Sequence, residues 1–414
     1  MRVIIIGCGI GGAATSLGLS RAGISHVVLE QAGELAEVGA GLQMSPNAMR
    51  VLRGLGLGDD ISRFGVQPAA HRFTDWRSGE VLMQTPLMPL AEEVFGAPYL
   101  HAHRADLLNA LVSRMAPDAI RLNATVESVE QTRDGVTAHL RGGGVETGDV
   151  LIGADGIHSL VREQVFRPDP PRDSGCVAWR GLVPAKDAQA LGFERNSYIW
   201  MGPDRSMVLY YVRGGDLFNW VGIGPFNAEA RESWSAKGSK AAALREYDGW
   251  HAQITGLIEA TDSLFMTALN DRDPLESWVE GRIALMGDAA HAMMPFHAQG
   301  AAQSIEDSWV LSRCLEDASD RDVPVALKKY ETLRLARANR VQQQSRAAEH
   351  LFHMTDADEI ARRNARFARH GASDVASNQA NNQGSFPPGQ QWLFAYDAEK
   401  AVRGDDDEWR ALSW

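Results

Sequence analysis

A glycine-rich turn near the N-terminus decides how this chain begins to fold. Residues 2–6 form a continuous apolar, mostly β-branched run, which predicts a strand covered on both faces. Residues 7–12 follow with the pattern G-x-G-x-x-G, and residues 13–22 have the composition of a helix that Gly23 ends. Residues 26–30 predict a second buried strand. Together these segments predict a βαβ unit, the first part of a doubly wound α/β sheet.

The glycines of this turn suit nucleotide binding, each for its own reason. Gly7 permits the tight turn, Gly9 lets the backbone approach a pyrophosphate, and Gly12 lets helix and strand pack closely. The helix N-terminus attracts phosphates through its free N–H groups and its dipole. Glu30 ends the second strand, where a carboxylate accepts hydrogen bonds from a ribose 2′-hydroxyl. The pattern fits NAD and FAD equally and predicts a dinucleotide site at Gly7, Gly9, Ile10, Gly11, Gly12 and Glu30.

Composition and charge exclude several classes of protein. The 414 residues are 44% hydrophobic and 23% charged, as in a globular protein of two or three domains. The net charge of −12 argues against nucleic acid as a partner. Cys8, Cys176 and Cys314 show no disulfide framework and no metal-ligand spacing, which favours a reducing cytoplasm and predicts no metal. No apolar run is long enough to span a bilayer, so we expect no membrane association.

The order of the predicted elements indicates an inserted domain. Strands and helices alternate in the first 171 residues, and short aromatic-rich strand patterns fill residues 172–275. A buried strand at residues 282–287 then precedes helices at residues 301–315 and 323–352. We predict an α/β fold in which a mostly antiparallel β-sheet domain is inserted into a Rossmann-type domain, with a C-terminal helical segment.

Two further motifs follow predicted strands. Residues 153–162 contain Asp155 in an Asp-Gly pair, and Gly287-Asp288 opens a second motif that leads to a helix at Gly300. An Asp at the carboxyl end of a parallel strand faces the ligand crevice, where it can bind a polyol hydroxyl. The Asp-Gly pair alone also fits an ordinary turn. His291 is predicted to be a local packing residue.

In this order and at these spacings, the three motifs resemble those of single-component FAD-dependent aromatic hydroxylases, the group A flavoprotein monooxygenases. The resemblance covers nearly the whole chain. It includes residues 37–48, 103–107 (HRADL), 179–181 (WRG) and 392–397 (WLFAYD). The last of these and residues 298–302 (AQGAA) are most similar to the branch that holds salicylate hydroxylase, 3-hydroxybenzoate 6-hydroxylase and 6-hydroxynicotinate 3-monooxygenase.

The resemblance implies the cofactor and the reaction. FAD is expected to bind without a covalent link, and NAD(P)H is expected to be a transient co-substrate that reduces it. Reduced flavin and O2 would give a C4a-hydroperoxide that hydroxylates a small phenolic or hydroxy-heteroaromatic acid, with or without decarboxylation. Beside the residues of the turn and Glu30, the implied FAD contacts are Gly41, Arg104, Val126, Asp155, Asp288, Pro295, Gly300, Ala301 and Ala302.

The resemblance also implies the domain boundaries and leaves a homodimer open. The FAD-binding domain takes residues 1–72, 101–171 and 276–352. The substrate domain takes residues 73–100 and 172–275, and residues 353–414 form the C-terminal segment. Residues 372–391, rich in Asn, Gln, Ser, Gly and Pro, predict a loop, and the basic stretch at residues 334–349 predicts a solvated helix face.

Two side chains are candidates for the chemistry on the substrate. His297 lies beside the flavin ring by its place in the family and titrates in a useful range for a base, with simple packing as the alternative. Tyr210 and Tyr211 are consecutive on a predicted strand, so only one can face the pocket, and the family pattern favours Tyr210. A His usually stands four residues before this Tyr in the 3-hydroxybenzoate and hydroxynicotinate branches. Ser206 takes that place here, which favours a salicylate-like ring.

Three other functions compete with this hypothesis. A plain NAD-dependent Rossmann dehydrogenase would not need the Gly287-Asp288 motif. A flavin-dependent halogenase normally carries Trp-x-Trp-x-Ile-Pro, whereas residues 179–184 lack the second Trp. A non-catalytic flavin-binding protein would not consume O2 with NADH. Arg104 is expected to contact the cofactor, and Arg180 is expected to be structural or to orient the flavin.

Overall fold

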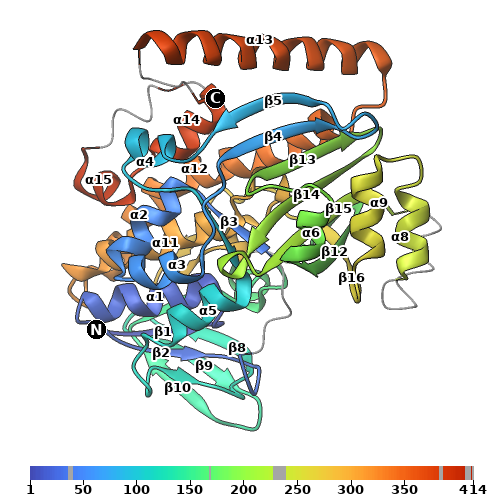
Figure 1. Ribbon diagram of the computed structural model, residues 1–414. Helices are drawn as coiled ribbons and strands as arrows, with labels where there is room; N and C mark the ends of the chain where they lie inside the picture. The colour runs from blue at the N-terminus through green and yellow to red at the C-terminus, as the bar shows by residue number, and fades with distance from the viewer. Residues whose placement is uncertain (36–40, 167–168, 227–238, 382–385, 406–411, 413–414) are drawn as a thin grey trace.

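Two large β-sheets organise the molecule, which is described by a computed structural model for residues 1–35, 41–166, 169–226, 239–381, 386–405 and 412 (Figure 1). The first sheet has six strands, parallel except for one edge strand. Their order is β17 (Val279–Glu280), β18 (Ile283–Leu285), β11 (Val150–Gly153), β1 (Arg2–Ile6), β2 (Ser25–Leu29) and β7 (Ile120–Arg121). The parallel order around β1 is that of the doubly wound sheet predicted from the sequence.

The N-terminal strand lies at the centre of this sheet because it is apolar on both faces. Residues 3–6 of β1 are buried, and β1 pairs in parallel with β2 on one side and β11 on the other. Helices α1 (Ile10–Arg21) and α11 (Gly300–Glu316) pack side by side in the same hydrophobic core as these strands. Gly18 lets the two helices approach, since a Cβ there would lie 2.3 Å from Ser312 Oγ.

The second sheet has seven strands and comes mostly from the middle of the chain. Its order is β16 (Leu264–Asp271), β12 (Arg172–Pro184), β15 (Leu217–Pro225), β14 (Arg205–Val212), β13 (Ser197–Gly202), β4 (Ala70–Asp75) and β5 (Val81–Pro86). All neighbours are antiparallel except β13 and β4. The domain boundaries stay a prediction, although β4, which crosses the boundary at residue 72, pairs entirely within this sheet.

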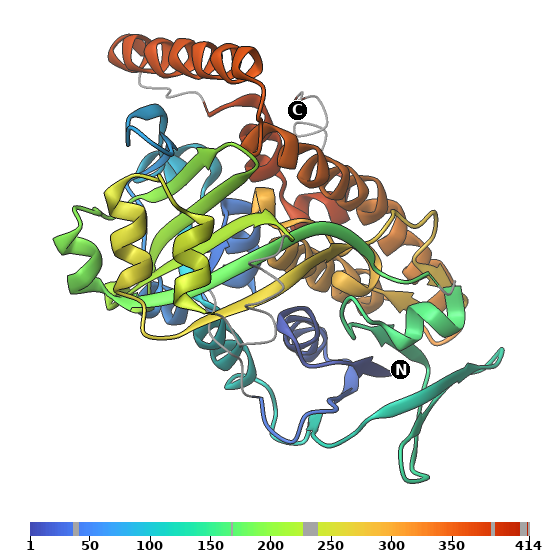
Figure 2. The same cartoon turned by 90° about the vertical axis from the view of Figure 1, so that its right-hand side faces the viewer.

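The two faces of the seven-stranded sheet have different neighbours. On one face Trp179, Trp220 and Tyr211 pack under α8 (Lys240–Glu246) and α9 (Ala252–Glu259), which lie over the strands in Figure 2. Successive strand residues point to opposite faces, so Arg180 and Tyr210 lie on the other face. That second face is turned toward the six-stranded sheet and holds the ligand site described below.

Smaller sheets and helices complete the fold. A three-stranded sheet contains β8 (Val126–Gln131), β9 (Val136–Leu140) and β10 (Val145–Gly148), and a two-stranded sheet joins β3 (Gly41–Met44) to β6 (Leu100–His103). The short turns are η1 (Arg162–Phe166), η2 (Arg213–Gly215) and η3 (Pro295–His297). The other helices are α2 (Pro46–Gly54), α3 (Gly58–Phe64), α4 (Leu90–Phe95), α5 (Arg104–Val112), α6 (Ala185–Ala190), α10 (Asp288–His291), α12 (Val323–Phe352), α13 (Ala357–Asn381), α14 (Pro388–Ala395) and α15 (Ala398–Arg403).

The C-terminal part departs from the sequence predictions in two places. Helix α13 continues to Asn381 and lies beside β5 (Figure 1), and α14 begins at Pro388, so the predicted loop at residues 372–391 is wrong at both of its ends. The predicted solvated face at residues 334–349 is also wrong, because Arg334 and Arg337 are fully buried in ion pairs with Glu306. The basic composition suggested that this helix face is exposed, but the two arginines are paired with a buried acidic residue on α11.

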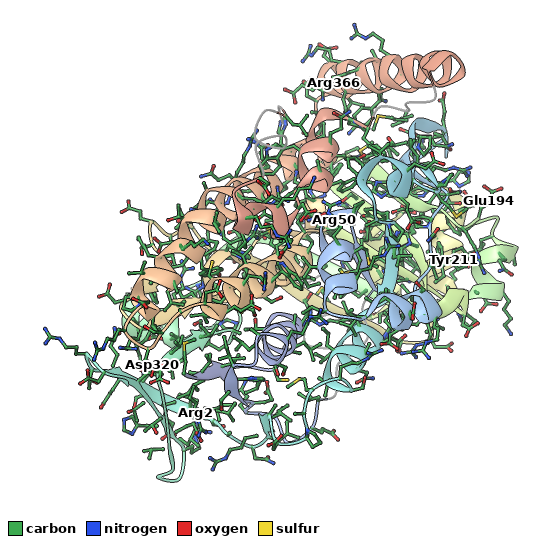
Figure 3. All side chains as sticks on the ribbon, turned by 90° about the vertical axis from the view of Figure 1, so that its left-hand side faces the viewer. Arg2, Arg50, Glu194, Tyr211, Asp320 and Arg366 are labelled. Atoms are coloured by element: carbon green, nitrogen blue, oxygen red, sulfur yellow. The ribbon has the colours of Figure 1, made fainter. Side chains whose placement is uncertain are left out.

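Arg50 shows how polar side chains join the C-terminal segment to the first domain. Its guanidinium donates to the carbonyl oxygens of Phe394, at 2.6 Å, and Tyr396, and Figure 3 places Arg50 where α2 meets these C-terminal residues. The C-terminal helices are thereby attached to α2. No helix in the described ranges is long and apolar enough to cross a membrane.

Candidate active site

A cavity of about 390 Å³ lies where the inner face of the seven-stranded sheet meets the carboxyl ends of the parallel strands. Part of its wall comes from the glycine-rich turn, from β3 and from residues 286–288. Apolar side chains form another part of the wall, here called the apolar wall: Val208, Val221, Ile223, Leu269, Met293 and Met294. Ligands of doubly wound proteins bind at this edge of the sheet, where successive strand–helix connections diverge.

The glycine-rich turn brings the backbones of β1 and α1 into direct contact. Gly7 has a φ of +98°, and a Cβ on Gly12 would lie only 2.0 Å from the Gly7 carbonyl oxygen. Gly9 differs, because its Cβ would meet no atom within 4 Å and the residue lines the cavity together with Ile10 and Gly11. The turn therefore offers open backbone to a ligand at Gly9, while Gly7 and Gly12 serve the packing.

Glu30, which contacts the turn, and Val126 both lie outside the cavity wall. The Glu30 carboxylate accepts hydrogen bonds from the backbone N–H groups of Cys8 and Ala32, both at 2.8 Å. Val126 begins β8 and packs against the core of the six-stranded sheet. A carboxylate oxygen can accept more than one hydrogen bond, so the predicted ribose contact of Glu30 stays a prediction.

Asp155 follows β11 and reaches the edge of the cavity. Its neighbours Ala154 and Gly156 line the cavity, and its Oδ2 accepts from the Val161 N–H at 3.2 Å. Its Oδ1 is buried and has no hydrogen-bond partner among the described residues. Burial raises the pKa of this carboxyl group, and hydrogen bonds from the Ser159 side chain and from the nearby backbone oppose the shift. A buried oxygen without a partner is costly, which indicates that a ligand hydroxyl belongs beside it.

Asp288 is exposed in the cavity wall at the first residue of α10. The preceding Gly287 has a φ of +56°, and its N–H donates to Asp307 Oδ2 at 3.0 Å. The same oxygen lies 2.6 Å from His291 Nε2, and both side chains are fully buried. The structure therefore gives His291 more than the predicted packing role, since its partner Asp307 holds the turn that presents Asp288.

The start of α11 forms a further part of the wall. Pro295, Gly300 and Ala301 line the cavity, and no side chain caps the free N–H groups at this helix end. Ala302 points into the core and lies outside the wall. An uncapped helix N-terminus attracts electron-rich or anionic groups, so α11 offers the same feature as α1 at the other end of the site.

The structure does not bring His297 to the cavity wall. Its ring hydrogen-bonds to the backbone of Gln344 on α12. Burial lowers the pKa of His297 to about 4, so the imidazole is neutral near pH 7. The chain position beside Pro295 was sufficient to suggest a cavity residue, but the η3 turn directs this side chain to the long helix.

Tyr210 and Tyr211 point to opposite faces of β14, as strand alternation predicts. Tyr210 lines the cavity, whereas the Tyr211 hydroxyl donates to the Phe193 carbonyl oxygen at 2.6 Å in the core under α8 and α9. Burial raises the pKa of Tyr210, and the nearby positive charge of Arg180 opposes this effect. Tyr210 therefore presents a protonated phenol to the cavity near pH 7.

Two arginines line the cavity near Tyr210. Arg104 begins α5 directly after β6, and Arg180 lies on the inner face of β12. Burial and the positive charge of Arg104 lower the pKa of Arg180, whereas Tyr210 opposes the shift. Within the described residues, Arg180 makes no hydrogen bond and no ion pair. A partly buried guanidinium that faces a cavity and has no anionic partner in the protein is well suited to bind an anionic group of a ligand.

The sequence reasoning missed Gln43 and the apolar wall. Gln43 lines the cavity from β3, and its Oε1 accepts from the Tyr99 hydroxyl at 2.6 Å. Gln43 belongs to the motif at residues 37–48, and this was the sequence signal that could have identified it as a cavity residue. Residues 37–40 of the motif lie outside the described ranges. The apolar wall could have been found by applying strand alternation to β14 and β15, because Val208 and Val221 share a face with Tyr210.

The fold and the cavity define a dinucleotide-binding α/β protein with a second sheet closed over the ligand crevice. Known proteins agree with this class. The sequence profile of the FAD binding domain family matches residues 1–345. The chain therefore belongs to this family, in its branch of FAD-dependent monooxygenases that hydroxylate aromatic rings, and the predicted family, fold class and cofactor are confirmed.

Its relatives include enzymes from two bacteria and one solved structure. 3-Amino-4-hydroxybenzoate 2-monooxygenase PtmB3 of Streptomyces platensis is 38% identical and is covered over 89% of its length by 86% of this chain. 6-Hydroxynicotinate 3-monooxygenase of Bordetella bronchiseptica is 36% identical, with 83% of this chain and 90% of the relative covered. A salicylate hydroxylase substrate complex has a TM-score of 0.78 at 26% identity and 97% coverage of both chains.

The residues present fit FAD. Open backbone at Gly9 and the uncapped N-terminus of α1 suit a diphosphate, and the unpartnered Asp155 Oδ1 and exposed Asp288 suit polyol hydroxyls. The uncapped N-terminus of α11 suits the electron-rich edge of the flavin ring. Glu30, Val126 and Ala302 lie outside the wall, so their direct contacts stay predictions.

Proposed function

We propose that this enzyme hydroxylates a small aromatic or heteroaromatic ring that carries both a hydroxyl group and a carboxylate, with NAD(P)H and O2 as co-substrates. The observation that carries the proposal is Arg180, a cavity guanidinium without an anionic partner in the described part of the chain. A carboxylate matches the donor geometry of a guanidinium in a way that a neutral phenol does not. The names of the relatives, 3-amino-4-hydroxybenzoate, 6-hydroxynicotinate and salicylate enzymes, support the same substrate class.

The rest of the cavity suits the ring and its hydroxyl. Val208, Val221 and Ile223 offer an apolar surface to the ring, which excludes water when the ring is bound. The Tyr210 hydroxyl lies on the same face as Arg180 and, as a hydrogen-bond donor, can orient the substrate hydroxyl or stabilise its phenolate form. Bound FAD, once reduced by NAD(P)H, supplies the activation of O2. The protein then positions the aromatic ring, supplies charged groups beside it and excludes water from it.

His297 plays a smaller part in this proposal than the sequence suggested. Its imidazole is engaged with the Gln344 backbone, and the side chain lies outside the cavity wall. We infer that it fixes η3 against α12 and so positions Pro295 in the wall. Of the two catalytic candidates from the sequence, Tyr210 is the one that lines the cavity.

A substrate panel tests the proposed class. Purified protein with bound FAD would be mixed with NADH or NADPH and with salicylate, 3-hydroxybenzoate, 6-hydroxynicotinate or 3-amino-4-hydroxybenzoate, and products would be identified by mass spectrometry. At least one hydroxy acid should accelerate NAD(P)H oxidation and give a product with one added oxygen, with or without loss of CO2. Phenol and benzoate, each lacking one of the two groups, are the controls. Faster turnover of phenol than of every hydroxy acid would overturn the proposal.

Arg180→Met and Arg180→Lys separate a substrate contact from a cofactor contact. A charge-assisted hydrogen bond is worth about 1.5–3 kcal/mol, so Arg180→Met should raise KM for the acid by roughly ten- to a hundredfold. Arg180→Lys should restore part of this loss because it restores the charge. FAD affinity, measured by fluorescence titration, should stay near that of the wild type. A loss of FAD affinity with an unchanged KM would assign Arg180 to the flavin instead.

The choice among these rings stays a prediction, as does the state of association. The Ser206 argument favours salicylate, whereas the relatives at 36–38% identity act on other hydroxy acids, and the panel above decides between them. We also propose a homodimer in the cytoplasm that binds neither nucleic acid nor membranes. Light scattering of the FAD-loaded protein measures the oligomeric state directly.

A further inference from the structure

A second group of chemically reactive side chains lies behind the cavity wall. The Cys176 thiol, a carboxylate oxygen of Glu349 and a ring nitrogen of His353 all lie within 4.8 Å of one another. The thiol is 3.3 Å from Glu349 Oε1. The three side chains come from β12 and from the C-terminal end of α12, and none of them lines the active-site cavity.

Local structure aims these three side chains at one point. Glu349 and His353 are four residues apart at the end of α12, a spacing that places two side chains on one helix face. Cys176 follows a break in the register of β12 with β16, and Gly175 has a φ of +73° there. Such bulges redirect a side chain out of the regular pleat. Cys176 is also tied down by the bond from its N–H to Ser174 Oγ at 3.1 Å.

The charges around this group are unbalanced. The only hydrogen-bond partner of the Glu349 side chain in the described residues is the Cys176 thiol, and Glu349 makes no ion pair there. The nearby guanidinium groups of Arg172 and Arg346 are both bound to Asp271 at 2.7 Å. Burial, and then the negative charge of Glu349, raise the pKa of Cys176 to about 12. Asp271 and, more weakly, the negative charge of Glu349 raise the pKa of Arg172, but no cation of the described residues pairs directly with the Glu349 carboxylate.

His353 is held in place by contacts outside the cluster. Its Nε2 lies 2.9 Å from Ser206 Oγ, and its ring meets the Phe296 ring edge to face at 5.2 Å. The bond to Ser206 fixes the ring, and histidines that bind metals through their other ring nitrogen are usually oriented in this way.

We propose that Cys176, Glu349 and His353 bind one divalent cation of the zinc class, with solvent as the fourth ligand. A sulfur, nitrogen and oxygen donor set matches the ligands that Zn²⁺ takes in proteins. Zinc bond lengths place ligand atoms roughly 3.5 Å apart, so donors within 4.8 Å need to close by about 1 Å. Binding releases the thiol proton to solvent, and the thiolate and carboxylate then balance the charge of the cation.

A bound cation would link helix α12 to the seven-stranded sheet. Cys176 packs with Ile223, Leu269 and Met294, and these three residues line the cavity. A cation at Cys176 would hold α12 to β12 one side-chain layer behind the apolar wall. No local sequence pattern indicates this site, because Cys176 and Glu349 are 173 residues apart. The proposal does not depend on the identity of the aromatic substrate.

Cobalt is the most direct probe because it reports its own geometry. FAD-loaded protein would be treated with a chelator, dialysed and titrated with Co²⁺. Tetrahedral cobalt with a thiolate ligand absorbs in the red, where oxidised flavin does not. We expect saturation at one Co²⁺ per chain, loss of the bands when Zn²⁺ is added, and about one zinc per chain in protein grown with zinc. A titration without red bands, together with no bound zinc, would overturn the proposal.

Matched variants assign the site. Cys176→Ser and His353→Gln should abolish the red bands, and Glu349→Gln provides the same test if Cys176→Ser fails to fold. Cys314→Ser removes another buried thiol and His350→Gln removes an exposed histidine of the same helix, and both should keep full binding. Ser206→Ala should weaken metal affinity by about ten- to a hundredfold, the usual effect of losing an outer partner. Unchanged binding in both Cys176→Ser and His353→Gln would reject this cluster.

Discussion

Tyr210 lies so close to Gly41 that no side chain fits on Gly41. A Cβ built there would lie 2.4 Å from Tyr210 Cε2 and 2.8 Å from the Tyr210 hydroxyl oxygen. The Gly41 N–H also donates to Asn219 Oδ1 at 2.8 Å, which fixes β3 against β15. The first residue of β3 thus contacts the candidate substrate residue directly. The position of the Tyr210 hydroxyl depends on this contact.

Gly41→Ala should therefore disturb hydroxylation. The ring of Tyr210 is fully packed, so it must move by a few tenths of an ångström or more to admit the methyl group. We expect less product per NADH consumed and more hydrogen peroxide, because a misplaced substrate lets the activated oxygen escape as peroxide. Product and peroxide are measured in the same reaction. Gly144→Ala is the control, since its Cβ would meet Leu140 at an ordinary 3.6 Å. Equal coupling in both variants would show that this contact does not position the substrate.

Gly9 and Gly12 should respond to alanine in opposite ways. Gly9→Ala meets no protein atom within 4 Å, so the protein without FAD should unfold at an unchanged temperature. The new methyl group would occupy the approach to the diphosphate, so FAD affinity should fall at least tenfold. Gly12→Ala places its Cβ 2.0 Å from a backbone oxygen, which should destabilise the fold by about 1–3 kcal/mol or more. Calorimetry of the FAD-free proteins and fluorescence titration with FAD separate the two effects.

The pH dependence of folding should contain a contribution from Asp307. Burial alone would raise its pKa, but His291 and Arg334 outweigh burial and lower the pKa to about 2. A carboxyl group with a pKa below its unfolded value stabilises the fold above about pH 4, and this contribution is lost as the pH falls toward 2. Asp307→Asn should lower the free energy of unfolding by about 3–5 kcal/mol at pH 7, because it removes a buried negative charge that pairs with Arg334 and His291.

Denaturant unfolding of the FAD-free protein at several pH values tests this prediction. The difference in free energy of unfolding between wild type and Asp307→Asn should shrink between pH 4 and pH 2. A constant difference would show that the Asp307 carboxyl keeps its ordinary pKa. Asp320→Asn, at an exposed carboxylate near the N-terminus (Figure 3), is the control and should change stability little.

The sequence predicted those parts of the fold that local pattern determines. The turn from Gly7 to Gly12 requires glycines for reasons of backbone geometry alone, so β1, α1 and β2 followed from it. Strand alternation likewise separated Tyr210 from Tyr211. Long-range partners were out of reach. Arg334 is buried because Glu306 and Asp307 lie on another helix, and no local pattern states that.

The same reason explains the departures at the site. His297 stands beside a cavity residue in the chain, but its direction is set by the Gln344 backbone on α12. Arg180 was expected to be structural or to orient the flavin, and its lack of an anionic partner became visible only in the three-dimensional arrangement, where the sheet faces the cavity. Cys176 was not predicted to bind a metal, because no other metal-ligating residue lies at a suitable spacing in the sequence. Its neighbours come from a helix that begins at Val323.

Tyr210→Phe and Tyr211→Phe form the sharpest pair of variants in this chain. Each removes one hydroxyl group from adjacent residues of β14, but only Tyr210 faces the cavity. Tyr211→Phe leaves the Phe193 carbonyl without its partner, so the free energy of unfolding should fall by about 1–3 kcal/mol while coupling stays normal. Tyr210→Phe should keep FAD binding and stability but lower hydroxylation.

The size of the loss at Tyr210 decides its role. If the Tyr210 hydroxyl stabilises the substrate phenolate by donating a hydrogen bond, the hydroxylation rate should fall by about 10²–10³-fold, with more NADH spent on hydrogen peroxide. If it only orients the ring, KM should rise with a smaller change in kcat. Single-turnover kinetics with reduced enzyme and O2 measure the hydroxylation step apart from flavin reduction. Normal coupling and an unchanged rate in Tyr210→Phe, with the same result in Tyr211→Phe, would remove Tyr210 from the active site and leave Arg180 as the polar group that orients the ring.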